Sequence, residues 1–249
     1  NLEQALDAVL QMTSDESYLE MLPQLELERA LIYQARDDTS VSAEAFRYIL
    51  DEHTRTPAAA RAHYYLGNMA FDRLDLNDAR NHYQQVTRID RDSDFRYDAE
   101  SQVQKITTFQ QVENQIARLE RTLKQEIDKD LEAARQDTSD TQSRSRGLLN
   151  ALQQVTGGNS FEFETFRTWA IQKDSSEQEG EYLDKLFHKA EILIFDLEQI
   201  EAGLELADML ASSGIDRNIT AKTLLLEEYV HEELLNDQQQ AEEYYNGLS

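Results

Sequence analysis

The stretch ARAHYYLGNMAFDRLDLNDARNHYQQVTRIDRDS, from Ala60 to Ser93, decides the fold. Its middle, residues 73–77, reads as a turn between two helices, which then run back along each other. Small residues stand at Gly67 and Ala79, one in each half, where the helices can cross closely. Apolar side chains that can fill the space around that crossing stand at Leu66, Tyr83 and Val86.

The same pattern occurs once more before this stretch. From Pro23 to Thr56 a small residue, Ala30, lies 37 residues before Gly67. We therefore read Pro57-Ala58-Ala59 as an insertion between two copies. Residues 1–12 read as the second helix of a still earlier pair.

Two further copies occur near the other end of the chain. Residues 183–216 place Ala190 and Ala202 at the small positions, and residues 219–248 read as one more helix pair. Repetition at a fixed period predicts stacked helix pairs that share one continuous core.

These units resemble the tetratricopeptide repeat (TPR), a helix-turn-helix of about 34 residues. The resemblance covers about 160 of the 249 residues. It implies an all-α, TPR-like helix-hairpin solenoid. The insertions between units and the segment AEILIFDLEQIEAGLELADML, residues 190–210, are similar to those of bacterial repeat proteins of the cell envelope. That likeness implies a periplasmic or outer-membrane-associated protein.

One long central helix is expected between the two arrays, over residues 109–136. Apolar residues recur there at steps of three or four, at Val112, Ile116, Leu119, Leu123, Ile127 and Leu131. The stripe fits either a coiled coil with another chain or packing within this chain. Steps of four are closer to a straight helix than to strict heptads, which favours packing within the chain.

A linker is expected after that helix. Residues 136–146 contain no apolar side chain and predict a loop, residues 147–156 a short helix, and residues 157–160 a helix breaker. The predicted organisation is thus an N-terminal repeat array over 1–108, the long helix with a flexible linker over 109–160, and a C-terminal array over 161–249.

The family resemblance also implies a binding surface, because TPR proteins line a concave groove with residues of the first helix of each pair. Carried over to the copy at Ala60, the groove residues are Arg61, Tyr64, Asn68, Phe71 and Asp72. In the C-terminal copy they are Asp184, Phe187, Glu191, Ile194 and Phe195. The implied partner is a protein or peptide segment. Phe187 and Phe195 have a second reading, which is burial against the neighbouring helix pair.

Charge excludes two classes of partner. The chain has 49 acidic and 24 basic residues and a formal charge of −25. Such a field repels nucleic acid and anionic lipid, so neither is expected as a partner. The acid excess also fits the solvated surface of a protein from a salty environment. No stretch approaches the roughly 18 apolar residues of a membrane span, so no membrane insertion is expected in this segment.

Chemistry-bearing motifs are weak. Cysteine is absent, and none of the five histidines forms a pair with metal-ligand spacing along the sequence. The aspartates between Asp90 and Asp98 alternate as in a calcium loop, but Phe95 stands where that loop requires glycine. We therefore read them as a solvated, helix-capping turn.

The sequence thus predicts no catalytic residue, no metal ligand and no cofactor, and a chain that is not an enzyme. The predicted function is a protein–protein interaction scaffold or adaptor that uses the concave groove, with envelope assembly as its setting. Two alternatives are a structural protein that self-associates through the long helix and the repeat ends, giving a homo-oligomer, and a divalent-metal-binding module.

Overall fold

A computed structural model describes residues 1–136, 161–172 and 177–247, and every regular element in these ranges is a helix. The predicted all-α fold is thereby confirmed. The chain divides into two compact units, Asn1–Thr107 and Thr108–Ser249. The predicted loop beyond Gln136, the short helix over 147–156 and the breaker over 157–160 lie outside the described residues.

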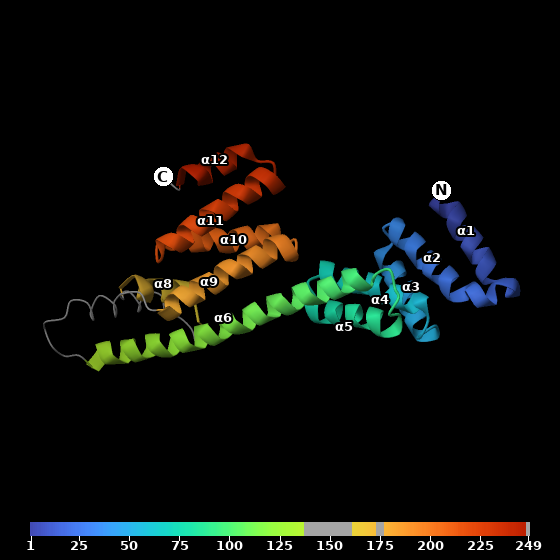
Figure 1. The fold of residues 1–249 in the computed structure, drawn as a ribbon, viewed down its shortest axis with the longest axis horizontal. Helices are drawn as coiled ribbons and strands as arrows, with labels where there is room; N and C mark the ends of the chain where they lie inside the picture. The colour runs from blue at the N-terminus through green and yellow to red at the C-terminus, as the bar shows by residue number, and fades with distance from the viewer. Residues whose placement is uncertain (137–160, 173–176, 248–249) are drawn as a thin grey trace. The chain divides into compact units, whose positions relative to one another are not determined.

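The first unit consists of helices that each pack against the next (Figure 1). Its elements are α1 (Leu2–Thr13), a short 3-10 helix (Glu16–Met21), α2 (Leu22–Ala35), α3 (Thr39–Glu52), α4 (Pro57–Asp72), α5 (Leu76–Ile89) and the start of α6 (Arg96–Gln136). Helix α4 begins earlier than the repeat pattern indicates. Pro57, Ala58 and Ala59 are its first turn and not a separate insertion, since Thr56 Oγ1 caps the helix by accepting from the Ala59 N–H at 3.2 Å.

Helices α4 and α5 cross closely at the two small residues that the sequence indicates, Gly67 and Ala79. The Cα of Gly67 lies against the ring of Tyr83, and Ala79 is fully buried. The turn between the two helices places Leu74 in the left-handed region at φ +59°. The turn after α2 does the same at Asp37, with φ +66°, 37 residues earlier in the chain.

Helix α6 is longer than predicted, because it begins at Arg96 instead of Phe109. Its first turns complete the core of the first unit, where Ala99 and Ile106 are buried with Tyr83 and Val86. The turn before it is capped by side chains: Asp90 Oδ1 accepts from the Asp92 N–H at 3.1 Å.

The second unit contains the rest of α6 and the C-terminal helices. These are α8 (Phe163–Gln172), α9 (Glu177–Glu191), a π turn (Ile192–Asp196), α10 (Ile200–Ala211), α11 (Arg217–Tyr229), a second π turn (Val230–Leu234) and α12 (Gln238–Gly247). The apolar stripe of α6 is buried inside this unit, at Val112, Ile116, Leu123, Ile127 and Leu131.

Polar contacts tie the same helix to α8 and α9. Trp169 Nε1 donates to Asp130 Oδ2 at 3.0 Å, and Lys189 Nζ lies 3.0 Å from Glu113 Oε1. The stripe therefore packs within the chain, which is the arrangement that its steps of four favour.

The π turns change the register of the helix pairs. Each adds one residue to a helical turn, as the bond from the Leu197 N–H to the Ile192 carbonyl at 3.0 Å shows. As a result Ala202, expected at the close crossing, is exposed. Gly203 occupies the crossing instead, where a Cβ would lie 2.4 Å from Ile194 Cγ1. The other expected small residue, Ala190, is fully buried as predicted.

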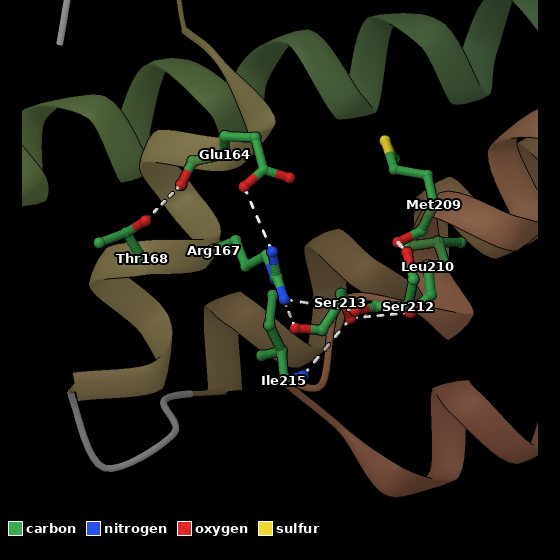
Figure 2. A network of polar contacts seen from close by, with 8 residues as sticks. All are labelled: Glu164, Arg167, Thr168, Met209, Leu210, Ser212, Ser213 and Ile215. Carbon is green, nitrogen blue, oxygen red and sulfur yellow. Dashed lines mark hydrogen bonds and ion pairs between the residues drawn. The ribbon is translucent and has the colours of Figure 1, made fainter. Parts of the chain in front are cut away.

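An arginine joins α8 to the end of α10 (Figure 2). Arg167 Nε donates to the carbonyl of Ser213 at 2.7 Å, and Nη2 donates to that of Ser212 at 3.4 Å. Glu164 holds the same guanidinium from the other side at 3.3 Å. A cation is favourable at these carbonyls, because the C-terminal end of a helix carries partial negative charge.

Candidate protein-binding surfaces

The groove residues predicted on α4 are largely engaged by the chain itself. The ring of Tyr64 lies 4.5 Å from that of Phe95, centroid to centroid. The Arg61 guanidinium stands 5.3 Å from the Phe95 ring centroid and 3.7 Å from Asp94. The segment that leads into α6 therefore occupies the side of α4 on which the predicted groove would begin.

The remaining α4 positions differ in exposure. Asn68 Oδ1 accepts a hydrogen bond from the Tyr83 hydroxyl at 2.8 Å, and burial raises the pKa of that hydroxyl above its ordinary value. Phe71 is partly buried against the core of the first unit. Asp72 is exposed. The structure thus gathers four of the five predicted residues into internal contacts and leaves Asp72 facing solvent.

The predicted residues of the C-terminal copy lie on α9 and its π turn. Phe187 is partly buried, and Lys222 Nζ lies 5.8 Å from its ring centroid while pairing with Asp184 at 2.9 Å. Glu191 lies 3.3 Å from His188 Nδ1. Ile194 is only 3% exposed and packs beside Gly203, so it supplies core contact and not surface.

Exposed apolar side chains gather instead around α11. Phe195 and Tyr229 meet edge to face with 6.0 Å between ring centroids. Even so, Phe195 is 44% exposed and Tyr229 is 50% exposed. Leu225, one helical turn before Tyr229, is 51% exposed. We call Phe195, Leu225 and Tyr229 the α11 ridge. Large apolar side chains grouped at the surface are typical of contact sites for other proteins.

Only part of this ridge was evident in the sequence. Phe195 appears among the carried-over groove positions, but Leu225 and Tyr229 do not. A usable signal was the run Leu224-Leu225-Leu226, because three consecutive residues of a helix cannot all face one core. Which of the three faces solvent depends on how α11 packs, and the sequence pattern does not settle that.

The sequence that contains most of the ridge and its neighbouring helices is strongly acidic. From Ile192 to Gly247 the sequence has 13 acidic residues and only two basic ones, Arg217 and Lys222. Lys222 is paired with Asp184. An open hollow of about 410 Å³ adjoins α11 and is lined by Glu228, Glu232, Gln238, Ala241 and Tyr245. This part of the second unit therefore combines apolar contact area with a negative field.

One acid of α11 is buried beneath this surface. Glu227 has no exposed area, and neither of its carboxyl oxygens has a hydrogen-bond partner. Burial, with a smaller contribution from the charge of Asp208, raises the pKa of Glu227 to about 7. Its side chain does not reach solvent, so we assign it to the interior of the unit and not to the contact surface.

Comparison of the chain with protein-family models, with curated proteins and with solved structures found no match. The resemblance to tetratricopeptide repeats therefore stays a prediction from the sequence. Among the helices of the described ranges, none combines the length and the apolar character that crossing a bilayer requires.

Proposed function

We propose that the chain is a non-catalytic scaffold for protein–protein interaction, and that its C-terminal unit holds a basic, amphipathic segment of a partner on the α11 ridge. The observation that carries this proposal is the exposed pair Phe195–Tyr229 in a region with 13 acidic and two basic residues. Aromatic side chains dominate the energy of many interfaces, and opposite charge speeds and orients the encounter.

The alternative of self-association through the long helix has less support. The apolar stripe of α6 that would form such a seam is buried within the second unit, for example at Leu123 and Ile127. A homo-oligomer would have to use another surface. Light scattering over a range of protein concentrations separates the two cases, since a scaffold without a partner keeps a constant molar mass.

The cellular setting is part of the proposal and rests on the sequence resemblance. A bacterial periplasmic or outer-membrane-associated adaptor suits an acidic scaffold that takes up basic segments. Predicted groove residues that stay accessible, such as Asp72 and Glu191, add negative charge to the scaffold.

A peptide-display selection with the full chain tests the partner class. We expect selected peptides to combine basic and large apolar residues, and to bind less tightly at 0.5 M than at 0.15 M salt because the ionic part is screened. Replacing both Phe195 and Tyr229 by alanine should weaken these peptides at least about tenfold in fluorescence anisotropy.

Tyr97→Ala is the matched control, because Tyr97 is 75% exposed but belongs to the first unit. It should leave the affinity unchanged. Selection of acidic peptides, or equal loss of affinity in both variants, would contradict the proposal.

A further inference from the structure

Two histidines far apart in the sequence meet between α4 and α5. His63 Nδ1 and His82 Nδ1 lie 2.8 Å apart, across 19 residues of chain. The ring centroids lie 5.1 Å apart, so the two ring radii account for nearly all of the remaining distance. Both nitrogens therefore lie close to the line between the ring centres, with their lone-pair directions facing each other.

Burial disfavours the charged form of both rings. Burial, and then the neighbouring His82, lowers the pKa of His63 to about 4. Burial lowers the pKa of His82, Arg47 and Arg73 lower it further, and Asp78 opposes them. At 2.8 Å one Nδ1 must donate its proton to the other, so one nitrogen of the pair already acts as an electron-pair donor.

We propose that His63 and His82 form a two-coordinate binding site for a soft monovalent cation, namely Cu(I). Two collinear imidazole nitrogens suit the linear coordination that this d10 ion accepts. They do not suit Zn²⁺, which takes four ligands. Among the described residues no group of three or more His, Cys, Asp or Glu side chains could hold a metal.

The change in structure that binding requires is small. A linear complex with metal–nitrogen bonds of about 2.0 Å places the nitrogens about 4 Å apart, so each ring moves back by about half an ångström. Both side chains are only part-buried, and 20% of the His82 side chain is exposed, which gives the ion a path to the pair.

Binding of the cation to two neutral rings releases no proton to solvent. The ring that carries its proton on Nδ1 changes tautomer and carries it on Nε2, and the freed Nδ1 lone pair binds the cation. For His82 this tautomer directs the Nε2–H toward Asp78, whose Oδ1 lies 3.8 Å away. A carboxylate behind a ligating histidine orients the ring and raises its basicity. The positive charges of Arg47 and Arg73 weaken the site, and the negative charge of Asp78 acts against them.

Silver ion is the probe for this site, because Ag(I) has the same linear preference and does not change oxidation state. The chain has no cysteine, so no thiol competes for it. Titration of the full chain by calorimetry should show one tight site. Nitrogen-15 NMR of the histidines should show the Nδ1 signals of His63 and His82 shifting together.

Two nearly isosteric variants separate ligation from packing. His63→Met supplies a thioether, a soft ligand, whereas His63→Leu supplies none. We expect His63→Leu to bind silver at least about tenfold more weakly than the wild type, and His63→Met to recover most of the affinity. His188→Asn, which alters a histidine of the second unit, should have no effect.

Equal affinity of the Leu and Met variants would overturn the proposal, as would silver binding that survives loss of both His63 and His82. Shifts confined to Nε2 atoms, or a shift of His188 alone, would place the ion elsewhere with the same consequence. Circular dichroism of each variant shows whether its helices are intact before the titration is read.

Discussion

Tyr83 fills the space beside Gly67. A Cβ built on Gly67 would lie 2.8 Å from Tyr83 Cε1 and 2.9 Å from Cδ1, closer than carbon atoms normally approach. Tyr83 is 1% exposed and its hydroxyl is held by Asn68, so the ring has little freedom to move away. The close crossing of α4 and α5 therefore depends on the missing side chain of Gly67.

Gly67→Ala should lower the stability of the first unit by about 1–3 kcal/mol, because the added methyl overpacks the crossing. Gly180→Ala is the matched control in α9, where a Cβ would meet nothing within 4 Å. That change should raise stability by about 0.5–1 kcal/mol, since alanine favours a helix over glycine. Urea denaturation followed by circular dichroism, with hydrogen exchange of α4 for Gly67→Ala and of α9 for Gly180→Ala, measures both changes. A Gly67→Ala protein as stable as the wild type would refute the packing argument.

Leu74→Gly should stabilise the first unit by about 0.5–1 kcal/mol. Leu74 has φ +59° in the turn between α4 and α5, a conformation that is costly for a residue with a Cβ and free for glycine. Its side chain is about half exposed, so little packing is lost. Thermal unfolding compares Leu74→Gly with Leu76→Gly, which removes a helical residue of α5 and should destabilise. A lower melting temperature for Leu74→Gly would show that the turn is not strained.

Glu227→Gln should remove a pH dependence from the second unit. Burial raises the pKa of Glu227 from 4.5 to about 7, so the folded state holds the proton more tightly than the unfolded state does. The resulting stability is fully present below pH 4.5 and is lost as pH rises through 7, with a total of up to about 3 kcal/mol.

The measurement uses urea unfolding between pH 5 and 8, followed by the fluorescence of Trp169, the chain's single tryptophan, which belongs to the second unit. The wild type should weaken over this range more than Glu227→Gln does. Glu232→Gln, an exposed neighbour on the following π turn, is the control and should keep the wild-type slope. Parallel curves for wild type and Glu227→Gln would contradict the assignment.

Arg167→Ala should destabilise the second unit by about 1–3 kcal/mol, because the carbonyls of Ser212 and Ser213 lose a charged donor (Figure 2). Arg167→Lys should recover only part of the loss, since lysine cannot reproduce the two-pronged geometry. Arg217→Ala, at an exposed arginine of α11, serves as the control. Tryptophan fluorescence during urea unfolding reports all three, and an unchanged midpoint for Arg167→Ala would show that the contact contributes nothing.

Much of the fold could be predicted because its signals are local. The spacing of apolar residues and the scarcity of glycine and proline give the helices directly, and the repeat of 37 residues reappears in the left-handed turns at Asp37 and Leu74. Local signals also misled at one point: the predicted start of the long helix at Phe109 was wrong, because α6 begins at Arg96. The turn before it contains many aspartates, which mask the fact that Ala99 and Ile106 already follow the helical period.

The candidate surfaces could be predicted less well. The family pattern assigns groove positions to α4, but it contains no information about what packs there, and Phe95 takes up much of that side. In the C-terminal copy the π turn shifts the register by one residue, which moves Gly203 into the place expected for Ala202. A sequence pattern with a fixed period cannot predict a one-residue shift of this kind.

The sequence by itself determined that this chain is helical and acidic, because helix propensity, apolar period and net charge are properties of neighbouring residues. Only the tertiary structure decided that His63 meets His82, that Glu227 is buried without a partner, and that Phe195 and Tyr229 stay exposed. Contacts between distant residues depend on how helices cross and rotate against one another. A single helical register shift changes every such contact while leaving the local pattern almost unaltered.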